Sequence, residues 1–264
     1  MFRFSGSLSF PSTVFLRRLV LFLGLILLLA TAADASQRRF THSYEATTQP
    51  KGAWEYEQWV TWKTHRDDDS QFDRFDIRHE IEYGLTDKLQ LALYFDWRYR
   101  DGRSVSKDRA EFRDVAFEAI YNLTDPTADP LGLAVYGEVK VGDEFLELEG
   151  KLLAQKNFGP VAAVYNLIVE AEYEGAHLDE DKGKIEQTAG ISYQVSPAFL
   201  VGAEFVHEIG FPDWDTTGHN VLYVGPNVSW RHKTWWITAT QLFQVSDVHD
   251  EANSQTRLLF GFDF

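Results

Sequence analysis

The sequence predicts an all-β protein, a 12-stranded antiparallel up-and-down transmembrane β-barrel after an N-terminal signal peptide. Two observations carry this prediction: apolar and polar residues alternate along most of the chain, and short and long connections separate the alternating runs. Composition agrees with it. With 15% aromatic residues, no cysteine and a mean hydropathy of -0.29, the chain is neither disordered, nor a disulfide scaffold, nor a helical membrane bundle.

The first 35 residues have the organisation of a secretory signal peptide. Arg17 and Arg18 precede an uncharged apolar run over residues 19–30, and small residues follow it up to Ala35. We expect cleavage after Ala35, so that residues 1–35 are removed and the barrel comprises residues 36–264. The alternative is an uncleaved anchor, which the run disfavours because a spanning helix needs about 20 apolar residues.

The alternation of apolar and polar residues is clearest over residues 89–100. One face carries Leu89, Leu91, Leu93, Phe95, Trp97 and Tyr99, and the other carries Gln90, Ala92, Tyr94, Asp96, Arg98 and Arg100. Successive side chains of a strand point to opposite sides, so this pattern indicates a strand with one apolar face. The same pattern predicts strands at 54–63, 75–83, 89–100, 111–122, 131–141, 145–156, 161–173, 185–195, 199–209, 220–231, 235–245 and 255–264.

The connections between these strands are mostly tight at one end and longer and polar at the other, which is typical of outer-membrane barrels. A soluble β-sandwich is the alternative, since it also alternates. Aromatic residues near the strand ends and charges deep inside the strands favour the barrel, because a wet lumen accepts charges that a sandwich core does not. An even number of strands returns the chain to its starting side, so we expect both termini in the periplasm.

The C-terminus resembles the terminal strand by which outer-membrane barrels are recognised for insertion: it ends at Phe264, with Phe260 and Phe262 at alternate positions. The turns at residues 84–87 and 122–126 are similar to those of a loose group of outer-membrane transporters that includes the one named for the MetA pathway of phenol degradation. This resemblance implies an outer-membrane location, transport, and contact with the barrel-assembly machinery through the last strand. It transfers no functional residue.

The polar face of the strands supplies the candidate pore-lining residues, and acidic residues outnumber basic ones on it. The candidates nearest mid-strand are Asp76, Arg78, Glu80, Asp96, Arg98, Asp114, Glu118, Glu138, Lys140, Glu170, Glu204 and Arg257. Twelve strands predict a narrow, partly plugged lumen. We expect small solutes or ions to pass through it with a cation preference set by Asp114, Glu118 and Glu204. Two alternatives stay open, a lumen whose charges merely pair and a closed structural or surface-interaction barrel.

Other functions and partners follow from charge and motifs. A net charge of -15 disfavours nucleic acid as a partner. A hydrolase is disfavoured because no Gly-x-Ser-x-Gly motif is present, and no cofactor is expected. The expected partners are outer-membrane lipid and lipopolysaccharide. Acidic stretches in the outer loops, such as Asp67–Asp69, either form a solvated surface or bind divalent cations that bridge to lipopolysaccharide.

Overall fold

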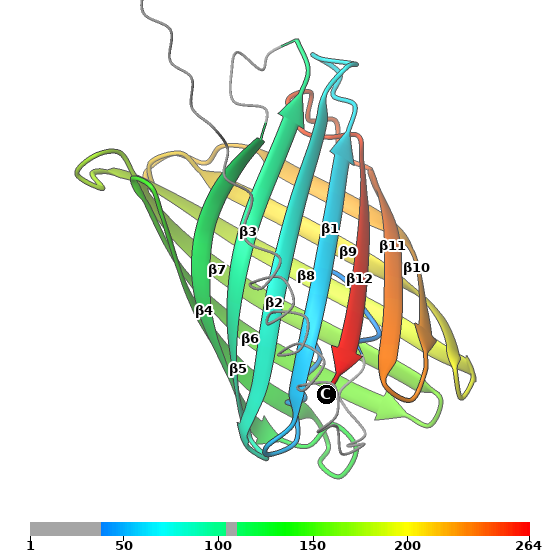
Figure 1. Ribbon diagram of the computed structural model, residues 1–264. Coiled ribbons are helices and arrows are strands. Elements are labelled where there is room, and N and C mark those ends of the chain that lie inside the picture. Colours follow the sequence, from blue (N-terminus) through cyan, green and yellow to red (C-terminus); the bar gives the residue numbers. More distant parts are fainter. Residues whose placement is uncertain (1–37, 104–109) are drawn as a thin grey trace, which may run out of the picture.

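The protein forms a closed barrel in which every strand pairs antiparallel with its chain neighbours and β1 pairs with β12 to close the ring (Figure 1). The computed structural model describes residues 38–103 and 110–264. The expected signal peptide, and the expected mature start at Ser36, lie outside the described residues. Within them, no helix has the length and apolar character needed to cross a membrane.

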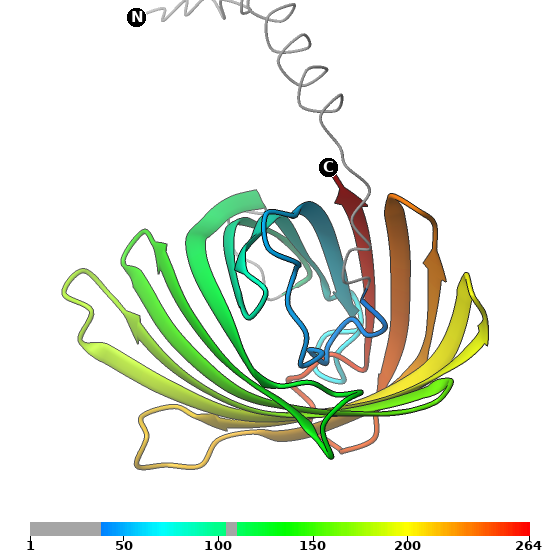
Figure 2. The same cartoon turned by 90° about the horizontal axis from the view of Figure 1, so that it is seen from below.

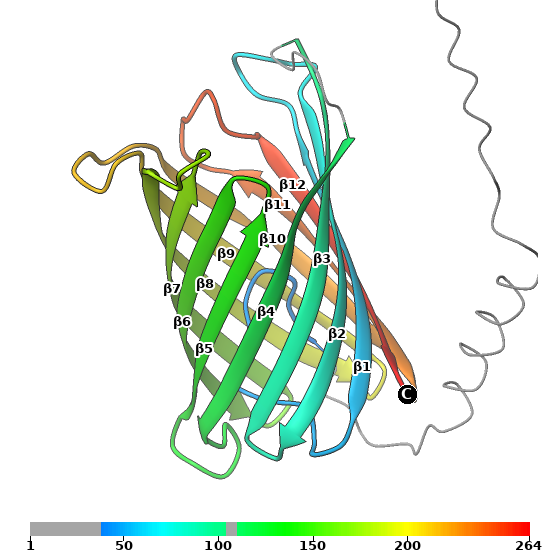
Figure 3. The same ribbon diagram turned by 60° about the vertical axis from the view of Figure 1, so that its left-hand side comes forward.

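The twelve predicted strands are all present, at or close to the expected positions. They are β1 (Trp54–Thr64), β2 (Asp73–Thr86), β3 (Leu89–Asp101), β4 (Ala110–Thr124), β5 (Gly132–Gly142), β6 (Phe145–Phe158), β7 (Val161–Glu174), β8 (Glu180–Ser196), β9 (Phe199–Phe211), β10 (Asn220–Arg231), β11 (Trp235–Gln244) and β12 (Ser254–Asp263). They slant across the barrel axis, as Figure 3 shows.

The two faces of each strand divide as the alternation predicts. On β3, Leu93, Phe95 and Trp97 are exposed on the outside, whereas Ala92 and Tyr94 are buried in the interior. Large apolar side chains are exposed in the same way on every strand except β9, whose outward apolar side chains are partly exposed. An apolar belt of this extent on the outside of a barrel suits contact with lipid rather than water.

The connections define two ends of the barrel. The short-turn end holds the connections at 87–88, 125–131, 159–160, 197–198 and 232–234, together with the start of β1 and the end of β12. The long-loop end holds those at 65–72, 143–144, 175–179, 212–219 and 245–253, together with residues 102–103, the described part of the connection between β3 and β4. One predicted loop is shorter than expected. Residues 180–184 extend β8 and pair with β7, because Lys184 lies 2.8 Å from Glu170 across the two strands and Lys182 pairs with Glu172 and Glu174.

Residues 38–53, which we call the N-terminal segment, lie inside the barrel before the chain enters β1. Figure 2, a view from the short-turn end, shows this segment crossing the interior in blue. Phe40, Thr41, Ala46 and Gln49 have no exposed surface. The sequence predicts a partly plugged lumen, and these residues are what fills its short-turn half.

Candidate functional site

Glu204 on β9 holds the N-terminal segment by a cluster of hydrogen bonds. Its carboxylate, in a side chain that is 1% exposed, accepts the backbone N–H groups of Thr41, His42 and Ser43, each at 2.8 Å. The Thr240 hydroxyl on β11 donates to the same carboxylate at 2.6 Å. Hydrogen bonds to a buried charged group are among the stronger ones in proteins, so Glu204 is the main anchor of the segment.

Three further backbone N–H groups of the segment are accepted by side-chain amides that point inward from the barrel wall. The pairs are Tyr44 with Asn166 at 2.6 Å, Ala46 with Gln155 at 2.8 Å, and Gln49 with Gln90 at 2.8 Å. Asn166 also donates back to the Tyr44 carbonyl at 3.0 Å. The wall thus satisfies the backbone of a segment that forms no strand of its own, as buried backbone requires.

Side-chain packing also holds the N-terminal segment in the lumen. The Phe40 ring fills the space beside Gly190 on β8, where an added Cβ would lie 2.6 Å from two ring carbons. The Arg38 guanidinium stacks on Tyr44 and Trp59, with its carbon 4.1 and 4.5 Å from the ring centroids, and lies 3.4 Å from Glu57. Burial disfavours the charged form of Arg38 and so lowers its pKa. The negative charge of Glu57, together with nearby groups, has the larger combined effect, and the pKa of Arg38 is raised above its usual value.

Above the segment, towards the long-loop end, the lumen contains a cavity of about 660 Å³. Among the described residues, eleven basic and eleven acidic side chains line it. Nine of the predicted pore-lining residues are among them: Asp76, Arg78, Asp96, Arg98, Asp114, Glu138, Lys140, Glu170 and Arg257. The cavity is therefore charged and balanced, whereas the whole polar face has an acidic excess.

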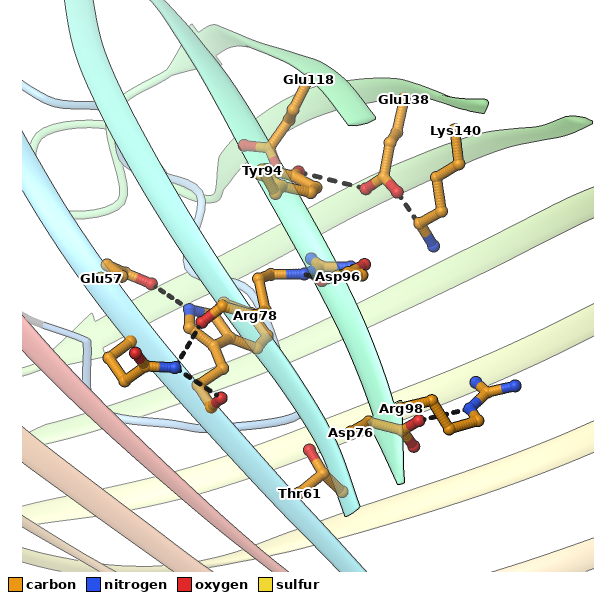
Figure 4. Close-up of polar contacts among 12 residues, drawn as sticks. Glu57, Thr61, Asp76, Arg78, Tyr94, Asp96, Arg98, Glu118, Glu138 and Lys140 are labelled. Atoms are coloured by element: carbon orange, nitrogen blue, oxygen red, sulfur yellow. Dashed lines mark hydrogen bonds and ion pairs between the residues drawn. The ribbon is translucent and has the colours of Figure 1, made fainter. Parts of the chain in front are cut away.

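Many of these charges form ion pairs between neighbouring strands (Figure 4). Arg78 on β2 donates to Asp96 on β3 at 2.9 Å, and Arg98 on β3 donates to Asp76 on β2 at 2.6 Å. Lys140 on β5 lies among several carboxylates. Its Nζ is 2.9 Å from Glu138, 2.7 Å from Glu147 and 3.7 Å from Glu149.

The two signs of charge are unevenly distributed around the cavity. The wall formed by β12, β1–β4 and the 65–72 loop contributes seven basic and three acidic side chains. The wall formed by β5–β9 contributes seven acidic and four basic side chains. A solute in the cavity therefore meets an electric field directed across the barrel.

The other three predicted residues, Glu80, Glu118 and Glu204, also point into the barrel but do not line the cavity. They are buried in the half that the N-terminal segment covers. Glu118 accepts a hydrogen bond from Tyr94, whose hydroxyl oxygen also lies 3.1 Å from the Glu138 carboxylate (Figure 4). With Glu55, Glu57 and Glu82, these residues make the covered half strongly acidic.

Sequence reasoning missed two parts of the site. It assigned no role to the N-terminal segment, and it left out five basic residues that line the cavity: Arg66, Arg74, Arg113, Lys182 and Lys184. A signal for the segment does exist in the sequence. Four amide side chains face inward on the part of the wall towards the short-turn end: Gln90, Gln155, Asn166 and Asn227. Because an amide side chain can both donate and accept hydrogen bonds, such a group indicates that a backbone segment lies against this part of the wall.

In the outer loops, Asp67, Asp247 and His249 come together, with one ligand atom from each residue within 4.8 Å of the others. All three residues are exposed. The acidic stretch Asp67–Asp69 thus meets the 245–253 loop at the long-loop end.

A closed twelve-stranded barrel with an apolar outer belt and a charged interior defines the class of outer-membrane β-barrels. Known structures with this fold include the COG4313 outer membrane channel from Pseudomonas putida F1, with 14% identity, a TM-score of 0.59, and coverage of 85% of this chain and 100% of that one. The KdgM porin is also similar, with 10% identity, a TM-score of 0.51, and coverage of 80% and 99%. No curated protein matches the sequence.

Within this class, the chain belongs to the family described as "Family of unknown function (DUF6662)", which matches residues 32–259. The comparisons do not confirm the resemblance to the transporter group named for the MetA pathway of phenol degradation.

Proposed function

We propose that the barrel passes small solutes or ions across the bacterial outer membrane. The observation that carries the proposal is the charged cavity of about 660 Å³, whose floor is the N-terminal segment rather than the barrel wall. Similarity in fold to the COG4313 outer membrane channel and the KdgM porin supports transport rather than catalysis. The field across the cavity favours small solutes that carry both signs of charge, because such solutes can orient in it.

Passage requires the N-terminal segment to shift, because it fills the short-turn half of the lumen. Six buried carboxylates would then meet water: Glu55, Glu57, Glu80, Glu82, Glu118 and Glu204. Acidic residues around a channel concentrate cations, so we expect a cation preference that increases when the segment leaves. The alternative is a closed structural barrel, which the hydrogen bonds of the segment to Glu204 favour.

The proposed setting follows the usual arrangement of such barrels. The apolar belt contacts outer-membrane lipid, both termini face the periplasm, and the strand ending at Phe264 is presented to the barrel-assembly machinery. At the opposite end, Asp67 and Asp247 would face lipopolysaccharide and bind bridging divalent cations through their carboxylates.

Conductance in planar bilayers tests the proposal. The full chain is compared with a chain lacking residues 38–48, which should conduct more strongly. Under a KCl gradient we expect a reversal potential of the cation-selective sign, reduced by the double substitution Asp114→Asn and Glu118→Gln. The reduction should weaken at 1 M salt, where the Debye length is about 3 Å.

Glu111→Gln is the matched control, because this acid lies on the same strand beside the long-loop end, outside both the cavity and the covered half, and is paired with Arg100 at 3.0 Å. Absence of conductance from both the full and the shortened chain would establish the closed structural barrel instead. Anion preference, or no response to the double substitution in a conducting barrel, would refute the assigned cation selectivity.

A further inference from the structure

The covered half of the lumen contains acidic side chains from neighbouring strands that face one another. Glu57 pairs in register with Glu80, and Glu55 with Glu82, across β1 and β2. Glu118 on β4 is separated from Glu82 by Ala92 on β3, which is in register with both. Alanine leaves the space above β3 free, so Glu80, Glu82 and Glu118 place carboxylate oxygens within 4.8 Å of one another. We call these three residues the Glu80 trio.

Two other trios of buried lumen acids are already neutralised or hydrogen-bonded. In the trio of Glu138, Glu147 and Glu149, the Lys140 ammonium lies within 3.7 Å of all three carboxylates. The trio of Glu55, Glu57 and Glu82 receives N–H donors from Arg38, Gln49, Trp59 and Trp236. Both trios show how this lumen normally compensates its acids.

The Glu80 trio is compensated only in part, because Gln49 donates to Glu82 and Tyr94 donates to Glu118 but no described residue donates to Glu80. Glu80 has no exposed surface, and neither of its carboxylate oxygens has a hydrogen-bond partner in the part of the chain that the structure describes. Oε1 of Glu118, also fully buried, is likewise unpartnered there. No basic side chain of the described residues forms an ion pair with the trio. Since unpaired buried carboxylates are strongly unfavourable, this arrangement requires neutralisation, either by a bound cation or by protons.

We propose that the Glu80 trio is a binding site for a hard divalent cation, Ca²⁺ in the first place. Ca²⁺ takes oxygen ligands at 2.3–2.6 Å, so oxygens up to about 5 Å apart can bind one ion. Three carboxylates, some of them bidentate, supply several oxygens without water. Mg²⁺ fits less well because it usually keeps several waters, and a trio at most 4% exposed has little room for them. Softer transition metals lack the nitrogen and sulfur ligands that they prefer.

The site lies beneath the N-terminal segment, whose Gln49 amide donates to Glu82 at 3.2 Å. A cation here would remove the electrostatic repulsion among acids that the segment covers. The proposal does not depend on whether the lumen conducts.

The test uses the full chain with Asp67→Asn and Asp247→Asn, which removes the exposed acidic group in the loops. Tb³⁺, a luminescent probe for Ca²⁺ sites, should be sensitised by Tyr94, whose hydroxyl bonds to Glu118. Ca²⁺ should displace it, and Mg²⁺ should do so less well. Glu80→Gln should weaken Tb³⁺ and Ca²⁺ binding by about tenfold or more, because the charge count of the ligands tunes affinity.

Thermal unfolding gives a second readout, in which the stability difference between Glu80→Gln and the parent chain should change sign between EDTA and Ca²⁺. In EDTA, Glu80→Gln should unfold at a temperature equal to or above that of the parent chain, because it removes a buried charge. In Ca²⁺ the parent chain should become the more stable of the two, while Glu172→Gln keeps the Ca²⁺ response. If Glu80→Gln does not fold, Glu118→Gln serves in its place.

The proposal is overturned if Ca²⁺ shifts neither Tb³⁺ luminescence nor the unfolding temperature of the parent chain. It is also overturned if the trio substitutions leave both responses unchanged. A parent chain that is stabilised by mild acid and is insensitive to Ca²⁺ would show that protons, rather than a metal ion, neutralise the trio.

Discussion

Replacing Glu204 with glutamine should release the N-terminal segment from the lumen. The two carboxylate oxygens accept three backbone N–H groups, one at Oε1 and two at Oε2. Glutamine turns one oxygen into an NH₂ donor, so at least one buried N–H group loses its acceptor whichever way the amide points. A buried unsatisfied group costs about 1–3 kcal/mol, and the remaining bonds lose their charge assistance.

A total of about 3 kcal/mol would raise the population of the released segment roughly 100-fold, at about 1.4 kcal/mol per factor of ten. The assay uses the absence of cysteine from the sequence. Ser43→Cys introduces a single thiol at a position that is 1% exposed and whose hydroxyl has no partner among the described residues. The rate at which a bulky maleimide modifies this thiol then reports release of the segment.

We expect modification to be roughly 100-fold faster with Glu204→Gln, provided that the segment moves rapidly compared with the chemical step. Glu208→Gln is the matched control, because Glu208 lies on the same strand and lines the cavity instead. Equal rates in the Glu204→Gln chain and the parent chain would refute the assignment of Glu204 as the anchor.

Three further predictions concern the segment and the outer belt. Gly190→Leu should displace the Phe40 ring and speed thiol modification, and adding Phe40→Ala should restore the slow rate; no rescue would contradict the packing argument. Leu93→Arg places a charge near the middle of the bilayer and should lower the free energy of unfolding in vesicles by about 2–4 kcal/mol. Val195→Arg, near the short-turn end, should lower it by only about 0–1 kcal/mol. Equal losses would contradict the proposed position of the barrel in the bilayer. Burial lowers the pKa of His42 well below its ordinary value of 6.5, and the positive charges of Arg257 and Lys63 add to this effect. The seated segment should therefore become less stable as the pH falls below 6.5, and His42→Gln should reduce the acid-induced rise in modification, measured after correction for thiol ionisation.

The sequence predicted the barrel well because its physical cause is local. A strand with one face in lipid and one face in a polar interior has to alternate, and β3 shows this from Leu89 to Arg98. The start of β8 was missed because residues 180–184 are polar on both faces, so alternation gives no signal there, and cross-strand pairs such as Lys184 with Glu170 hold the strand.

The candidate site was predicted only in part. Inward orientation follows from parity, so Asp76, Arg98 and Glu204 were placed correctly on the inner face. Which inner residues are covered depends on where a segment without regular structure lies. Its contacts reach β9, which follows it by more than 160 residues, and no local pattern encodes a contact of that range.

That sequence separation has a consequence for the order of assembly. The partners of Thr41 and Arg39 lie 163 and 188 residues later in the chain, on β9 and β10. Contacts between such distant residues form late, because closing the intervening loop costs entropy before any contact offsets it. We therefore expect each newly made molecule to pass through a stage with formed walls and an unfilled interior. During that stage the buried acids can exchange ions freely with their surroundings, and arrival of the N-terminal segment ends it.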